Sequence, residues 1–96
     1  MIRDLHVIVA YDITDDKRRR QLVKLLKGFG VRTQYSFFEC LLSDAQLVKL
    51  KQGIRAIVSK DEDRVGIMHV CAPCFSRIFR IGYRPPAMFD ETDVIA

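Results

Sequence analysis

Apolar residues follow two different spacings in the first third of the chain. Residues 5–11 (LHVIVAY) form an almost continuous apolar run that is rich in β-branched side chains, which is typical of a strand in the interior of a sheet. Further on, apolar residues recur at intervals of three and four positions: Leu22, Leu25, Leu26 and Phe29. This second spacing marks one face of an amphipathic helix. We therefore predict a central strand followed by a helix over about residues 15–29.

Residue preferences at helix ends predict the boundaries of this first helix. Thr14 is a favourable N-cap residue. Asp15 and Asp16 place negative charge at the positive end of the helix dipole. Gly30 is typical of the residue that ends a helix.

The middle and later parts of the chain predict further strands and one more helix. Residues 31–42 are rich in aromatic and β-prone side chains and predict two short strands or one bent strand. Ser43 and Gln46 have the spacing of a capping box, and the helix that they open has an apolar face formed by Leu47, Leu50, Ile54, Ile57 and Val58. Residues 65–70 predict a strand, and residues 74–80 a short helix or a turn into a further strand near 78–82.

The order of these elements predicts an α+β fold. A βαββαβ order fits the ferredoxin-like sandwich, in which two helices cover one face of an antiparallel sheet. A doubly wound fold would need more strand–helix repeats. The 96 residues suit one small domain, which we expect over residues 1–84. We expect residues 85–96 to form a C-terminal tail with a short strand.

The distribution of charge indicates a polyanionic partner. The net charge is +4, and one side of the predicted helix has cations within about 80° of each other at 100° per residue: Lys17, Arg20, Lys24 and Lys27. Such a stripe suits the phosphates of duplex DNA, contacts that carry no sequence information. A solvated helix face is the alternative interpretation. Arg18 and Arg19 lie outside the stripe, and we expect them near the end of the first strand.

Asp12 follows directly after the buried run. Mg²⁺ prefers about six oxygen ligands and keeps much of its water, so one carboxylate per chain is a poor site. Two chains that meet at a two-fold axis would supply two copies of Asp12. The alternative interpretation is a turn residue between strand and helix.

Two long segments carry a resemblance to a known family. Residues 7–43 (VIVAYDITDDKRRRQLVKLLKGFGVRTQYSFFECLLS) resemble the opening of the second family of CRISPR-associated proteins, the small ferredoxin-like partner of the CRISPR integrase. The matching features are a strand that ends in Tyr-Asp, Asp-Asp before a basic helix, a Gly-Val-Arg-x-Gln turn, and Ser-x-Phe-Glu in the next strand. Residues 67–82 (IMHVCAPCFSRIFRIG) look like the later strand of the family with a Cys-x-x-Cys variant.

The resemblance implies a homodimer in the CRISPR adaptation machinery. In such a dimer Asp12 faces its own copy and binds Mg²⁺ or Mn²⁺, and the resemblance implies that the final strand adds to the sheet of the partner. Family members are described as metal-dependent endonucleases that act on single-stranded RNA or double-stranded DNA, and as a non-catalytic bridge that holds duplex DNA with the integrase during spacer acquisition. The implied catalytic set is Tyr11, Asp12, Arg18 and Arg19. The expected nucleic-acid contacts are Lys17, Arg20, Lys24, Lys27 and Arg32, with Ser36 and Phe38 also on motif positions.

Other functions and sites stay open at this stage. A toxin-like messenger-RNA endonuclease of related fold would share the strand-end acid, and a small-molecule sensor domain is a further alternative. Three cysteines do not make a disulfide framework. We expect Cys71 and Cys74 to be buried apolar thiols, because together with His69 they supply three of the four ligands that structural zinc requires. We expect a cytoplasmic protein without a membrane span, because no apolar run approaches 18 residues.

Overall fold

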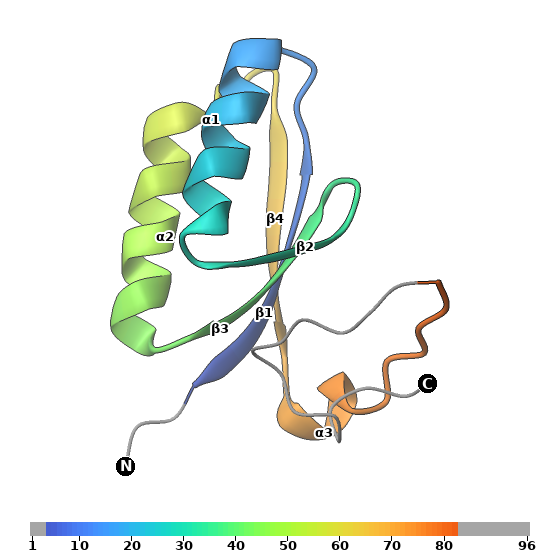
Figure 1. Ribbon diagram of the computed structural model, residues 1–96. Helices are drawn as coiled ribbons and strands as arrows, with labels where there is room; N and C mark the ends of the chain where they lie inside the picture. The colour runs from blue at the N-terminus through green and yellow to red at the C-terminus, as the bar shows by residue number, and fades with distance from the viewer. Residues whose placement is uncertain (1–3, 83–96) are drawn as a thin grey trace.

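The computed structural model describes residues 4–82, which form a two-layer α+β domain (Figure 1). The elements in chain order are β1 (Leu5–Asp12), α1 (Asp16–Lys27), β2 (Gly30–Gln34), β3 (Phe37–Leu42), α2 (Asp44–Ile57), β4 (Arg64–Val70) and α3 (Ala72–Phe75). In this part of the chain, four strands form one antiparallel sheet in the order β2-β3-β1-β4. Helices α1 and α2 cover one face of it. The predicted α+β ferredoxin-like arrangement is confirmed.

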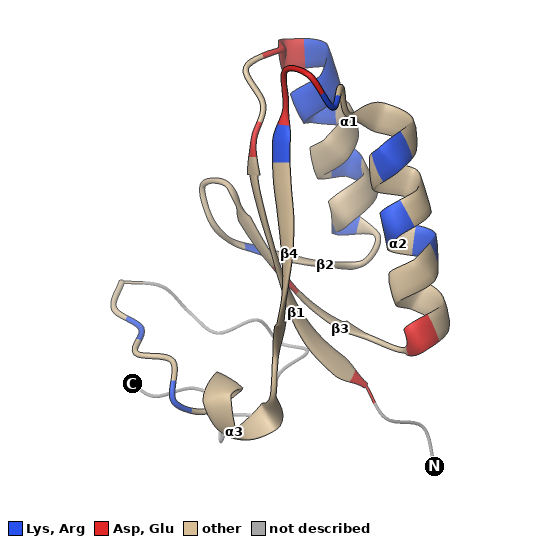
Figure 2. Ribbon diagram, turned by 180° about the vertical axis from the view of Figure 1, so that it is seen from behind, with Lys and Arg blue, Asp and Glu red and all other residues tan. Residues whose placement is uncertain are grey.

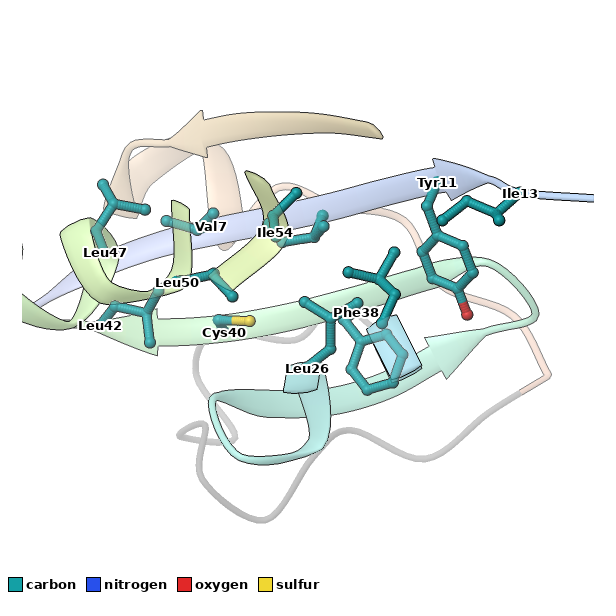
Figure 3. Packing of buried hydrophobic residues seen from close by; sticks show 12 residues of the cluster. Val7, Tyr11, Ile13, Leu26, Phe38, Cys40, Leu42, Leu47, Leu50 and Ile54 are labelled. Carbon is teal, nitrogen blue, oxygen red and sulfur yellow. The ribbon is translucent and has the colours of Figure 1, made fainter. Parts of the chain in front are cut away.

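The core lies between the sheet and these two helices (Figure 3). Because side chains alternate along a strand, Val7, Val9 and Tyr11 of β1 point toward the helices and are buried. Phe38 and Cys40 of β3 lie on the same face and are fully buried. Strand β1 pairs with β3 on one side and β4 on the other, so the predicted central position of residues 5–11 is also confirmed.

The boundaries of α1 differ from the prediction. Asp15, and not Thr14, is the N-cap residue, and its carboxylate accepts a hydrogen bond from the Arg18 backbone amide at 2.9 Å. The helix ends at Lys27 instead of Phe29. Gly30 is the first residue of β2, where a Cβ would overlap the Glu39 carbonyl oxygen and the Cys40 sulfur. This glycine therefore permits close pairing of β2 with β3 and does not end a helix.

Helix α2 begins as predicted. The Ser43 hydroxyl accepts from the Gln46 amide at 3.2 Å, and the Gln46 side chain accepts from the Ser43 amide at 2.9 Å, which completes the capping box. A Cβ at Gly53 would lie 2.8 Å from a methyl carbon of Leu25 in α1. Glycine at this position costs helix propensity of about 1 kcal/mol but lets the two helices pack closely.

The second face of the sheet is partly covered by α3 and residues 76–82 (Figure 1). Phe75 is 1% exposed, and its ring stacks on His6 with a centroid distance of 4.4 Å. Arg80 donates two hydrogen bonds of 2.7 Å to the carboxylate of Glu39. The predicted turn region therefore holds a short helix at Ala72–Phe75, and an isolated bridge residue at Phe79 replaces the further strand considered near residues 78–82.

Two further predictions concern the C-terminal strand and membrane-spanning helices. The C-terminal strand expected in residues 85–96 lies outside the described residues. Across residues 4–82, none of the helices combines the length and the apolar character needed to cross a membrane.

Candidate functional site

Asp12 is the last residue of β1 and lies on the sheet face opposite α1 and α2. It is exposed, and its cross-strand neighbour in β4 is Arg64. In Figure 2 an acidic and a basic ribbon segment lie side by side where β1 ends and β4 begins. Next to Asp12 is a shallow depression of about 560 Å³ lined by Tyr11, Asp12, Ile13, Thr14, Arg19, Tyr35 and Ser36. Three of the four residues expected to be catalytic thus meet at one place.

Tyr11 holds a neighbouring cation in position. Its side chain points toward the helices, and its hydroxyl accepts a hydrogen bond from Arg32 at 3.0 Å and donates one to the Tyr35 carbonyl at 3.3 Å. The Arg32 guanidinium also lies 5.8 Å from the ring centroid of Phe38 and 6.0 Å from that of Tyr35. These contacts fix the direction of a cation that would otherwise be mobile on the surface.

Arg19 stabilises the turn between β1 and α1. It donates to the carbonyl oxygens of Ile13 and Thr14 at 3.1 and 3.3 Å and pairs with Asp16. The same side chain borders a second hollow, a basic groove of about 360 Å³. Arg19 therefore lies between the Asp12 depression and this groove.

Arg18 points away from Asp12, toward the loop before β4. It donates to the two carboxylate oxygens of Asp63 at 2.8 and 3.2 Å and to Glu62 at 3.3 Å. Asp63 is 6% exposed and also accepts from the Ser59 amide at 2.7 Å. The Arg18 hydrogen bond, with that of Ser59, lowers the pKa of Asp63. The structure therefore does not bring Arg18 to the depression.

The basic groove lies between α1 and β2. Its lining is Arg19, Arg20, Val23, Lys24, Lys27 and Arg32. Three members of the predicted stripe are present, and Arg32 joins them from the neighbouring strand. Lys17 is exposed at the start of α1 but does not line the groove. The groove offers several cations to an extended chain of phosphates.

Sequence reasoning missed two residues of this region. Arg64 is opposite Asp12 because of the β1–β4 register, which no local pattern specifies. Tyr35 is 85% exposed on the turn between β2 and β3. An aromatic side chain is unusual at an exposed turn position, and its presence there in the sequence indicates a candidate functional residue. Phe38, which falls on a motif position, is a core residue.

A divalent metal would need more than one chain at this place. Of the described residues that line the depression, Asp12 is the one acid. Across residues 4–82, no three His, Cys, Asp or Glu side chains are grouped so that they could hold a metal. The donor set therefore fits Mg²⁺ or Mn²⁺ when a second copy supplies its own Asp12 and water fills the remaining positions.

The sequence predicts that Cys71 and Cys74 are buried thiols, but in the structure only the third cysteine, Cys40, is buried. Cys40 is fully buried, and desolvation raises its pKa to about 11. Cys71 and Cys74 are exposed. The prediction is therefore wrong for the Cys-x-x-Cys pair, because α3 turns these side chains away from the sheet while it buries Phe75.

The fold and the site define a small α+β protein of the ferredoxin-like class with a strand-end carboxylate beside a basic groove. The family model for CRISPR associated protein Cas2 matches residues 5–78. The CRISPR-associated endoribonuclease Cas2 of Thermus thermophilus is 39% identical over 94 residues, which are 98% of this chain and 100% of the relative. The chain belongs to the Cas2 family of CRISPR-associated proteins, which confirms the resemblance.

Solved structures agree with this family. The crystal structure of Streptococcus pyogenes Cas2 matches with a TM-score of 0.72 and 28% identity, over 80% of this chain and 99% of that chain. A chain of a partial Cas6-RT-Cas1–Cas2 complex matches with a TM-score of 0.59 and 25% identity, over 80% of this chain and 90% of that chain.

Proposed function

We propose that this chain works as a homodimer that binds duplex DNA together with the CRISPR integrase during spacer acquisition, and that it hydrolyses phosphodiesters with Mg²⁺ or Mn²⁺. The observation that carries the proposal is the position of Arg19, which borders both the Asp12 depression and the basic groove. A phosphate backbone that lies along the groove would therefore reach Arg19, which also borders the depression that contains Asp12.

The cations of the groove support a nucleic-acid partner. Arg20, Lys24 and Lys27 are exposed along α1, and Arg32 is held against them by the Tyr11 hydroxyl. Lysine and arginine side chains in such a row bind phosphates and release counterions. Because these side chains contact the backbone of a nucleic acid and not its bases, the proposed binding is independent of sequence.

The exposed face of the sheet supports a homodimer. Phe37 and Met68 are large apolar side chains of this face that remain exposed, and Phe79 and Ile81 are exposed in the residues after α3. A large exposed apolar patch marks an interaction site. Asp12 belongs to the same face, since it alternates with Tyr11, which points toward the helices. Two copies that join through this face would bring both Asp12 carboxylates into one interface.

The residues near Asp12 then have separate roles in hydrolysis. A bound divalent metal supplies polarisation of the phosphoryl oxygen and a water of lowered pKa. Arg19 and Arg64 stabilise the negative charge that develops on the phosphate. Tyr11 positions Arg32. Arg18 holds the loop before β4 through Asp63, and so acts on Arg64 through the backbone.

The proposed partner is the integrase Cas1. One matching structure is named as a complex that contains Cas1 and Cas2, and the relative from Thermus thermophilus is named an endoribonuclease. RNA is therefore a second substrate to test beside duplex DNA. A non-catalytic bridging role is the second candidate function, and the single acid that each chain contributes to the depression favours it.

Asp12→Asn separates the two candidates, because it removes the negative charge and keeps the shape of the side chain. The assay measures cleavage of labelled RNA and duplex DNA with Mg²⁺, with Mn²⁺ and with a chelator. It also measures duplex binding with and without Cas1. Asp61→Asn is a matched control, because Asp61 is exposed in the loop before β4. We expect cleavage to disappear in Asp12→Asn while binding persists.

Different results would contradict the metal dependence, the role of Asp12 and the binding of duplex DNA. Cleavage by wild type that is equal with metal and with chelator would overturn the metal-dependent role. Cleavage that persists in Asp12→Asn would remove Asp12 from it. Wild type that binds but does not cleave any substrate would support the bridging role alone. Failure to bind duplex DNA at any salt concentration would overturn both candidates.

A further inference from the structure

Cys71 and Cys74 form an exposed pair of thiols that the proposed function does not use. Cys71 is the N-cap residue of α3, and Cys74 lies within the single turn of that helix. Cα atoms three positions apart in a helical turn are about 5 Å apart. This separation falls inside the range of about 4.4–6.8 Å over which a disulfide forms without strain.

The ionisation of each thiol depends on the other. Their side-chain interaction is the main cause that lowers the pKa of Cys71 and raises that of Cys74. The positive charge of Arg77 also lowers the Cys71 pKa. Because the thiolate is the attacking species in disulfide exchange, this difference favours Cys71 as the nucleophile of the pair and Cys74 as the resolving thiol.

A small molecule has room to reach Cys71. A depression of about 640 Å³ lies beside it, lined in part by His6, His69 and Val70. The third cysteine, Cys40, is buried in the core with its pKa raised to about 11. Access and thiolate character therefore both favour Cys71 over Cys40.

The pair is also next to the contacts that hold α3 on the sheet. Phe75 follows Cys74 directly and stacks on His6. The Phe75 amide donates to the Cys71 carbonyl at 2.8 Å. A covalent bond between the two sulfurs would restrict the turn that carries Phe75.

We propose that Cys71 and Cys74 are a reversible thiol–disulfide exchange site for low-molecular-weight disulfides such as oxidised glutathione. The Cys71 thiolate attacks one sulfur of the small disulfide, whose S–S bond breaks and releases one thiolate that takes a proton from solvent. Cys74 then loses its proton and attacks the Cys71 sulfur of the mixed disulfide, which releases the second small thiol. Two protein thiols are oxidised to one disulfide, and one small disulfide is reduced to two thiols.

The test incubates the full chain with defined ratios of reduced and oxidised glutathione and follows it by intact mass and peptide mapping after acid quench. We expect loss of the mass of two hydrogen atoms, a Cys71–Cys74 peptide link, and an unmodified Cys40. Cys74→Ser should stop at a mixed disulfide on Cys71. Cys71→Ser should form no intramolecular disulfide, because it lacks one of the two thiols, and should stop at a mixed disulfide on Cys74.

A control variant and a second measurement complete the test. Cys40→Ala, which leaves the exposed pair intact, should form the disulfide like wild type. Amide hydrogen exchange at Phe75 and Ser76, whose amides bond back to residues 71 and 72, should slow on oxidation. No intramolecular disulfide at any glutathione ratio, a link between chains in its place, or equal reactivity of Cys40 in the folded protein would each overturn the proposal.

Discussion

Asp12 at the end of β1 lies opposite Arg64 at the start of β4 in the antiparallel register. Cβ atoms of such cross-strand neighbours are about 4.5–5.5 Å apart, so the Arg64 side chain begins next to that of Asp12. The Arg18–Asp63 ion pair fixes the residue just before Arg64. The strand-end acid and its neighbouring cation are therefore positioned by two separate parts of the fold.

Removal of the Arg64 charge should slow hydrolysis. If Arg64 stabilises negative charge on the phosphate, Arg64→Gln should lower turnover about 10²-fold, with a smaller change in duplex affinity. Turnover and affinity are measured on the same labelled substrate with Mg²⁺ or Mn²⁺. Arg55→Gln, an exposed arginine of α2, is the control. Wild-type turnover in Arg64→Gln would exclude this arginine from the site.

Arg32 should contribute one phosphate contact of fixed direction. We expect Arg32→Ala to weaken duplex binding and to reduce the slope of log K against log salt by about 0.9, the value for one lost phosphate contact. Fluorescence anisotropy over a salt series measures this slope. Lys49→Ala on the exposed side of α2 should leave the slope unchanged. Equal slopes for wild type and Arg32→Ala would place the nucleic acid elsewhere.

The Arg18–Asp63 contact should make stability depend on pH. The pKa of Asp63 in the folded protein lies below its ordinary value of 3.8, so its contribution is fully present above that value and disappears as pH falls through the folded pKa. Asp63→Asn should therefore melt at a lower temperature than wild type near neutral pH, and the difference should narrow below about pH 4. Thermal melts from pH 7 to pH 2 measure it.

Asp61→Asn is the matched control for this pH dependence. Asp61 is an exposed acid of the same loop, and its substitution should give melting curves parallel to those of wild type. A gap between wild type and Asp63→Asn that stays constant over the whole pH range would contradict the pKa assignment.

Gly30 should tolerate no side chain. A Cβ there would overlap backbone of β3, and overpacking of this kind costs about 1–3 kcal/mol. Urea unfolding of Gly30→Ala should therefore show a lower midpoint than wild type at equal protein concentration. Gly66 has nothing within 4 Å of an added Cβ, so Gly66→Ala should unfold like wild type. An unchanged midpoint in Gly30→Ala would contradict the close pairing of β2 and β3.

Local sequence patterns predicted most helices and strands but did not predict the contacts between them. The run at residues 5–11 and the Ser43–Gln46 capping box each depend on neighbours in sequence, and both were predicted correctly. Thr14 and Asp15 are both good N-cap residues, and the path of the chain out of β1 decides between them. Gly30 satisfies a strand pairing that is set by residues ten positions away.

The site depended more on long-range contacts. Arg18 and Arg19 are adjacent in sequence but about 100° apart around the helix, and Asp63, 45 residues away, draws Arg18 from the depression. Cys71 and Cys74 follow an apolar strand and were expected in the core. Their exposure results from the way Phe75 and Arg80 dock on the sheet, which no spacing in the sequence indicates.

In the proposed site, two chains share one metal between their Asp12 carboxylates. Titration of the protein with Mn²⁺, followed by electron paramagnetic resonance of the free ion, measures the stoichiometry directly. We predict one tightly bound Mn²⁺ per two chains and loss of that binding in Asp12→Asn. One Mn²⁺ bound by each chain alone, or binding that is undiminished in Asp12→Asn, would contradict it.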